Sequence, residues 1–108
     1  MEKRIGKIQK ISFGHGGYQD ACLGVAVTLG SDGWGVGDFK GTWSRKPDDR
    51  CQWTETDQTN IWGEMCRWIG GLLKDAKVDS LEKLAGKPVE VTLDGNCLKS
   101  WRILTEAI

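Results

Sequence analysis

Residues 14–43 read GHGGYQDACLGVAVTLGSDGWGVGDFKGTW and hold nine of the chain's 15 glycines. The same stretch contains two tryptophans, one tyrosine, the only histidine and three aspartates. Glycine adopts backbone conformations closed to other residues and lets a second backbone or a ligand approach the main chain closely. So many glycines beside flat aromatic side chains predict a shaped surface that a partner contacts. The alternative is that the glycines serve only tight turns and close packing.

Length and charge limit the classes of protein to consider. A chain of 108 residues forms a single domain, residues 1–108, with one hydrophobic core. Its 15 basic and 15 acidic residues balance, so no overall field directs it to extended nucleic acid or to a membrane. A net charge near zero also permits copies to associate, which leaves a homo-oligomer open. Residues 1–13 alternate between charged and apolar and contain no signal-like apolar stretch, so we expect a cytoplasmic protein.

In the first half of the chain, apolar residues recur with the two-residue period of β-strands. Alternating apolar residues predict three strands, at residues 4–13, 20–29 and 34–43. The step from Ile5 to Ile8 breaks the alternation of the first strand, so we expect a bulge near Gly6 or Lys7.

Turn residues 30–33 join the second and third strands into a hairpin. A symmetric turn would pair Leu29 with Trp34. The same register would bring Asp20 beside Trp43, and a slip by one residue stays open because glycine-rich strands specify register weakly. One face of the second strand carries only small side chains, which could lie under another layer or under a ligand: Cys22, Gly24, Ala26 and Thr28.

The second half predicts one helix and a closing hairpin. A Thr54 cap and a helical apolar period indicate a helix over residues 55–76, with a further turn at 80–84. Glycines inside this helix, Gly70 and Gly71 among them, predict close packing on the sheet or a kink. A turn at residues 94–96 follows, with Cys97, Trp101 and Ile103 on one strand face. The expected fold is therefore α+β, in the order β-β-β-α-β-β. It has a five-stranded, mostly antiparallel sheet with one long helix packed on a face.

Neither a metal nor a cofactor is expected. The cysteines lack a C-x-x-C pair and there is one histidine, so buried free thiols are favoured over zinc coordination or disulfides, which spacing alone leaves open: Cys22, Cys51, Cys66 and Cys97. The glycine-rich loops lack the strand-to-helix context of a dinucleotide fingerprint. A nest of backbone amides at residues 14–17 that binds phosphate is the remaining alternative.

The sequence gives only weak support to an enzymatic function. A small hydrolase could use His15 with Asp20 and Asp38, since carboxylates and imidazole perform acid–base chemistry. Aspartates beside glycines are, however, commonly turn-formers that bond to their own backbone. No nucleophile has a recognisable base beside it in the sequence. We therefore expect no catalytic residue.

The sequence gives more support to a binding surface made of aromatic side chains, because six tryptophans are many for a chain of this length. Trp68 and Trp101 fit the core, whereas Trp34, Trp43 and Trp53 border turns, glycines or a polar loop. Exposed tryptophan and tyrosine side chains could stack on a ligand or anchor an interface. Four basic residues lie near Trp43 and Trp53 in the sequence: Lys40, Arg45, Lys46 and Arg50. Asp48 and Asp49 offset that charge and argue against extended DNA or RNA. The predicted binding residues are His15, Gly16, Gly17, Tyr18, Asp20, Trp34, Asp38, Lys40, Trp43 and Arg45.

Three segments cover nearly the whole chain: IGKIQKISFGHGGYQDACLGVAVTLG, GWGVGDFKGTW and GKPVEVTLDGNCLKSWRILTEAI. Together they resemble a family of small accessory proteins encoded by tailed bacteriophages and prophages. The most distinctive parts are G-x-G-G-Y-Q-D at residues 14–20 and G-W-G-V-G-D at 33–38. The resemblance implies an accessory protein that acts in the cytoplasm of an infected bacterium.

A non-enzymatic binding protein is the function that these observations favour. By analogy with small phage proteins, it would inhibit a host defence by sequestering a nucleotide messenger or by blocking a host protein. A small hydrolase and a structural or assembly accessory are the two alternatives. Turnover of a nucleotide or peptide distinguishes the first, and absence of any small ligand the second.

Overall fold

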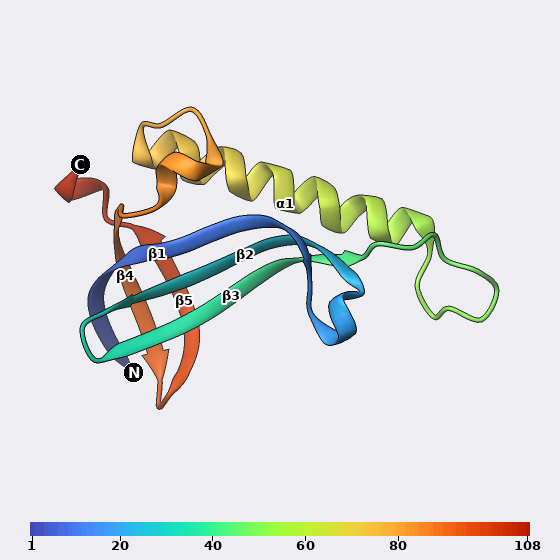
Figure 1. Ribbon diagram of the computed structural model, residues 1–108, viewed down its shortest axis with the longest axis horizontal. Helices are drawn as coiled ribbons and strands as arrows, with labels where there is room; N and C mark the ends of the chain where they lie inside the picture. The colour runs from blue at the N-terminus through green and yellow to red at the C-terminus, as the bar shows by residue number, and fades with distance from the viewer.

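Five strands form one antiparallel sheet in the order β3-β2-β1-β4-β5, and one long helix lies along it (Figure 1). The computed structural model describes residues 1–108 except for the side chain of Tyr18. The elements are β1 (Glu2–Gly16), β2 (Cys22–Ser31), β3 (Trp34–Trp43), α1 (Glu55–Ala76), β4 (Pro88–Asp94) and β5 (Cys97–Ile103). Short 3-10 turns lie at Tyr18–Asp20, Leu81–Leu84 and Thr105–Ala107. The predicted α+β class and the β-β-β-α-β-β order are confirmed.

Strand β1 is long enough to join the two halves of the sheet. Residues 2–7 pair with β4, and residues 7–16 pair with β2. The predicted bulge near Gly6 or Lys7 is wrong, because the register shifts between Ile8 and Lys10. Ile5 simply points outward, with 57 % of its surface exposed, so strict alternation continues as far as the buried Ile8. The extra residue is therefore Gln9, two positions after Lys7 in the chain.

The β2–β3 hairpin is as long as predicted but shifted in register. Ser31 pairs with Trp34, and Cys22 pairs with Trp43, instead of the expected partners Leu29 and Asp20. The turn closes in two residues, since Gly33 has a φ of +85° that other residues rarely adopt. A shift of two positions leaves each side chain on the same face of the sheet.

Helix α1 has the predicted bounds. Thr54 caps it reciprocally: its hydroxyl accepts from the Asp57 N–H at 3.1 Å, and its own N–H donates to the Asp57 carboxylate at 2.9 Å. The expectation that Gly70 and Gly71 pack closely is wrong, because an added Cβ at either would meet no atom within 4 Å. The helix runs through both positions, and nothing in the structure explains these two glycines.

The closing hairpin differs from the prediction on one face. The register shifts between Thr92 and Leu93, so Leu98, rather than the predicted Cys97, joins Trp101 and Ile103 at the core.

None of the four cysteines is in a disulfide. The expectation that they are buried is wrong, because Cys22 and Cys51 are half-buried, and Cys66 and Cys97 are exposed.

The sheet curls until its two edge strands meet. The indole Nε1–H of Trp101 on β5 donates to the Asp38 carboxylate on β3 at 2.8 Å. Five strands in this order, with the helix between the third and fourth, form a curled sheet that resembles a partly open barrel. The core lies between the sheet and α1: Ile8, Val25, Val27, Leu29, Met65, Leu72, Ala76, Leu84, Val89, Val91, Leu93 and Ile103.

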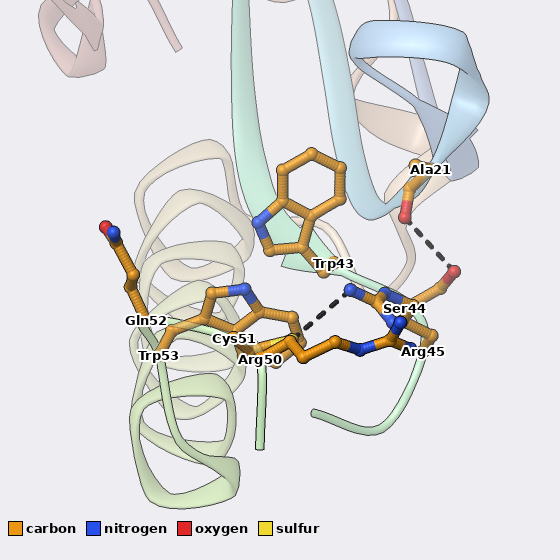
Figure 2. A pocket seen from close by; sticks show the side chains of 8 residues that line it. All are labelled: Ala21, Trp43, Ser44, Arg45, Arg50, Cys51, Gln52 and Trp53. Carbon is orange, nitrogen blue, oxygen red and sulfur yellow. Dashed lines mark hydrogen bonds between the residues drawn. The ribbon is translucent and has the colours of Figure 1, made fainter. Parts of the chain in front are cut away.

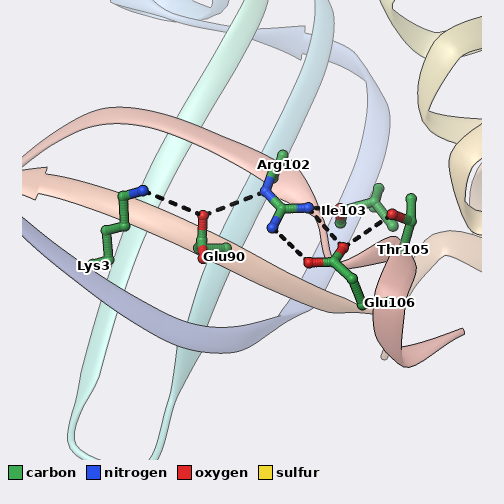
Figure 3. A network of polar contacts seen from close by, with 6 residues as sticks. All are labelled: Lys3, Glu90, Arg102, Ile103, Thr105 and Glu106. Atoms are coloured by element: carbon green, nitrogen blue, oxygen red, sulfur yellow. Dashed lines mark hydrogen bonds and ion pairs between the residues drawn. The ribbon is translucent and has the colours of Figure 1, made fainter.

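On its outer face the β4–β5 hairpin carries a chain of ion pairs (Figure 3). Arg102 contacts Glu90 at 3.3 Å and binds both carboxylate oxygens of Glu106 at 2.9 Å. Lys3 of β1 reaches the same Glu90 at 3.9 Å. These contacts tie the C-terminal turn to the sheet.

Candidate functional site

The predicted binding residues fall in three separate places. The β1–β2 turn and the end of β3 lie at the same end of the sheet, because Gly16 and Trp43 both pair with Cys22. This end holds seven of the ten predicted residues: His15, Gly16, Gly17, Tyr18, Asp20, Trp43 and Arg45. The side chain of Tyr18 is outside the described part of the structure. Trp34, Asp38 and Lys40 lie elsewhere.

Asp38 and Lys40 lie on the face of β3 that the helix covers. The Asp38 carboxylate is engaged by Trp101, and it also accepts from the Phe39 N–H at 2.9 Å. Lys40 places its ammonium 5.8 Å from the centre of the Trp68 ring. Trp68 in turn meets Trp101 edge-on at 5.8 Å, and both half-buried indoles pack against the core. These residues stabilise the closure of the barrel.

Trp34 lies at the opposite end of the hairpin from Trp43. Its half-buried ring lies 5.6 Å from the guanidinium carbon of Arg4. An added Cβ at Gly6 would lie 2.9 Å from the same ring. Trp34 therefore covers the crossing of β1 and the hairpin, away from the remaining predicted residues.

Several glycines of the hairpin serve strand packing. An added Cβ at Gly24 would lie 2.2 Å from the Lys40 carbonyl oxygen, and one at Gly41 would lie 2.5 Å from the Leu23 carbonyl oxygen. Real Cβ atoms do not approach backbone so closely. At these positions the backbone of the neighbouring strand is the group that approaches the glycine closely.

At the Trp43 end, the loop after β3 forms a pocket of about 460 Å³ (Figure 2). We call it the Trp–Arg pocket; it is lined by Ala21, Trp43, Ser44, Arg45, Arg50, Cys51, Gln52 and Trp53. Small-molecule sites typically measure about 300–1,000 Å³. The two indoles are half-buried, while the two arginines are exposed. The pocket thus combines aromatic faces with cationic groups.

Both tryptophans of the pocket lie at the ends of regular elements. Trp43 ends β3, and Trp53 directly precedes the Thr54 cap of α1. Gln58, 5 % exposed, donates from Nε2 to the carbonyl oxygens of Trp43 at 2.5 Å and Arg45 at 2.9 Å. The strand end, the loop and the helix are therefore connected by one buried amide.

A single carboxylate organises the arginines. Asp48 Oδ2 lies 3.1 Å from Arg50 Nη2 and 3.6 Å from Arg45 Nη1. Asp48 Oδ1 accepts from the backbone N–H of Arg50 at 2.9 Å. These contacts, the backbone N–H first and the Arg50 guanidinium next, lower the pKa of Asp48. Arg45 also donates to the Cys51 sulfur at 3.2 Å, which links it to the pocket wall.

Arg50, Cys51 and Trp53 are missing from the predicted set. Trp53 and Arg50 stand out in the sequence as an aromatic and a basic residue of the polar loop, beside Trp43. Their contribution depends on the loop folding back on itself, because Cys51 N–H bonds to the Asp48 carbonyl at 3.0 Å. No periodic pattern in the sequence predicts that this loop folds back on itself.

The geometry gives little support to a phosphate nest or to a hydrolytic couple. Gly14 and Gly16 lie in the paired part of β1, and of the residues 14–17 only Gly17 has a positive φ, +72°. His15 pairs with Leu23, whereas Asp38 pairs with Val27, about 13 Å further along β2. Among the described residues, no three His, Cys, Asp or Glu side chains gather as metal ligands.

Comparison with known proteins adds no relative. No protein-family model matches the chain, and no curated protein or solved structure matches it significantly. Neither α1 nor a shorter helix of the described chain is apolar over enough length to span a bilayer.

Proposed function

We propose that this protein is a non-enzymatic binding protein that holds a small nucleotide in the Trp–Arg pocket. The observation that carries the proposal is the meeting of two indoles and two guanidinium groups in one open pocket. Figure 2 shows Trp43 and Trp53 beside the side chains of Arg45 and Arg50. The nucleotide would be sequestered rather than converted.

The chemistry of the lining supports a nucleotide. Aromatic side chains stack on nucleobases, and each stacked base contributes about 1–3 kcal/mol to binding. Guanidinium groups donate planar pairs of N–H bonds that match phosphate oxygens. A base on Trp43 or Trp53 and a phosphate at Arg45 or Arg50 would use both kinds of group at once.

The setting that we propose is bacteriophage infection. It rests on the resemblance of the segments at residues 14–20 and 33–38 to phage accessory proteins. In that setting, a protein that sequesters a nucleotide messenger would inhibit a host defence in the bacterial cytoplasm.

Nucleotide binding is tested by equilibrium titration with a panel of mononucleotides and dinucleotides of the four bases. Replacing both indoles, Trp43→Ala with Trp53→Ala, removes the stacking surface, so affinity should fall at least about tenfold. Trp34→Phe, at the far end of the hairpin, is the matched control and should bind normally. Chromatography after incubation should recover the nucleotide intact.

Three results would overturn the proposal. One is a panel from which nothing binds the folded protein. Another is binding that survives loss of both indoles. The third is consumption of the nucleotide, which would favour the hydrolase alternative with His15, Asp20 and Asp38.

A further inference from the structure

The second half of β1 has a neighbouring strand on one side only. Residues 2–7 of β1 pair with β4, whereas residues 10–16 pair with β2. Beyond residue 7, β4 no longer accompanies β1, and the second half of β1 runs below α1 (Figure 1). We call this unpaired side of residues 10–16 the β1 edge.

The alternation of hydrogen bonds shows which backbone groups face the β1 edge. The Ser44 N–H donates to the Ala21 carbonyl at 2.9 Å, so odd-numbered residues of β2 bond to β3 and even-numbered residues bond to β1. The β1 residues opposite the odd-numbered positions consequently direct their N–H and C=O groups away from β2: Ile11, Phe13 and His15.

Ile8 shows what these groups would normally bond to. It has the same orientation, and its N–H and C=O pair with the backbone of Lys87 and Gly86 at 3.0 and 2.7 Å. Among the described residues, no backbone group pairs with the β1 edge at Ile11, Phe13 or His15. A row of free donors and acceptors on an extended strand is a template for a further strand.

An apolar groove accompanies the β1 edge. It measures about 280 Å³ and is lined by Phe13, Val25, Met65, Cys66, Ile69 and Leu81, so it lies between β1 and α1. The side chain of Phe13 lies on the same face of the sheet as the buried Val25, yet Phe13 is 54 % exposed. An exposed aromatic ring beside an unpaired strand is typical of a surface that another chain covers.

The outer edges of the sheet are protected, whereas the β1 edge is not. On β5, the register shift leaves Lys99 as an extra residue, and bulges and lysines both hinder strand pairing. On β3, the Asp38 carboxylate accepts from the Phe39 N–H, and the Gln58 amide donates to the Trp43 carbonyl. Residues 11–15 contain no lysine, acidic residue or proline.

We infer that the β1 edge binds a second copy of this chain, and that the two β1 strands pair antiparallel about a two-fold axis at Phe13. In this register residues 11, 13 and 15 face residues 15, 13 and 11 of the other copy. Each outward N–H then meets an outward C=O, so one surface complements itself. The two Phe13 rings lie opposite each other, where aromatic pairs stabilise strand pairing.

The charges of the strand fit a second copy. Lys10 has the only charged side chain of residues 10–16 apart from His15, and it would face Gly16 of the other copy. Ser12 would face Gly14, so the pairing opposes no like charges. The net charge of zero adds no overall repulsion between copies.

Sedimentation velocity tests the inference, and the native protein should have about twice the 12.0 kDa mass of one chain. Phe13→Lys places two ammonium groups opposite each other at the axis and should raise the dissociation constant at least about tenfold. Ile5→Lys is the matched control, since Ile5 is 57 % exposed on the other half of β1. This control should remain dimeric, and its dissociation would mean that the interface lies elsewhere.

A second variant guards against loss of the fold. His15→Pro removes an N–H that faces the β1 edge but none that bonds to β2, so it should weaken the dimer while circular dichroism stays native. Hydrogen exchange needs no variant: the amides of Ile11, Phe13 and His15 should exchange slowly in the concentrated native protein and rapidly after dilution.

Three results would overturn the inference. One is a native protein that is monomeric at about 100 μM. Another is a dimer that Phe13→Lys and His15→Pro, both folded, leave intact. The third is rapid exchange of the three edge amides within the dimer. None of these measurements depends on nucleotide binding, so the proposed function stands or falls separately.

Discussion

At the scale of single residues, the glycines of the β2–β3 hairpin divide into two kinds. Gly24 lies against the backbone of β3, where a Cβ would fall 2.6 Å from the Gly41 Cα. Gly37, on the same hairpin, has only the Val27 carbonyl oxygen nearby, at 3.7 Å from an added Cβ. The first position requires glycine for packing, while the second has room for a methyl group.

We therefore expect Gly24→Ala to lower the free energy of unfolding by about 1–3 kcal/mol, the usual cost of overpacking. Gly37→Ala should change it by less than about 1 kcal/mol, or raise it, because alanine restricts the unfolded chain. Urea denaturation of both variants measures the difference. Equal destabilisation of the two would contradict the packing role of Gly24.

At the scale of elements, one hydrogen bond joins the edge strands β3 and β5. The Asp38 carboxylate is half-buried and accepts from Trp101 Nε1 at 2.8 Å. Hydrogen bonds to charged groups contribute about 1.5–3 kcal/mol. We expect Trp101→Phe to destabilise the protein by about that amount. A double-mutant cycle with Asp38→Ala should give a coupling energy of about 1 kcal/mol or more. Additive effects of the two substitutions would mean that the strands close without this bond.

The C-terminal turn offers a pH-dependent prediction. The bidentate contact with Arg102 lowers the pKa of Glu106 from 4.5 to about 2. The ion pair therefore stabilises the turn fully above pH 4.5, and this stabilisation is lost as the pH falls through about 2. Because both side chains are exposed, the effect on global stability should be small. An NMR titration of the Glu106 carboxyl should give a midpoint near pH 2, and Arg102→Gln should return it towards the ordinary range. An unchanged midpoint in that variant would exclude Arg102 as the cause.

At the scale of the whole molecule, local patterns predicted the elements better than their assembly. The bounds of α1 and β3 follow from the helical period, the Thr54 cap and the turn glycines, which act over a few residues. The bulge of β1 and the register of the hairpin depend on contacts with neighbouring strands, so they were predicted two or three positions away from where they lie. The Trp–Arg pocket combines a turn, a strand end and a helix start, and no single period spans them.

The molecule is also elongated, with extents of 47 × 32 × 20 Å and a radius of gyration of 15.1 Å. A compact domain of this length would have a radius of gyration of about 13 Å. In Figure 1 the β4–β5 hairpin lies at one end, and the β1–β2 turn and the loop after β3 lie at the other. The pocket thus lies at the other end of the molecule from the β4–β5 hairpin, and we expect it to open locally without unfolding the rest.

Gln58 tests this separation. Its side chain bonds two carbonyl groups, of Trp43 and Arg45, and Gln58→Ala would leave both without that donor. An unsatisfied buried acceptor costs about 1–3 kcal/mol. We expect the loss to appear as local opening: amide hydrogen exchange should accelerate about tenfold or more in residues 43–53, with protection of the β1–β4 pairing changed far less. Gln52→Ala, an exposed residue of the same loop, is the control and should leave exchange unchanged. Uniform acceleration across the sheet in Gln58→Ala would instead show that the pocket and the barrel unfold as one unit.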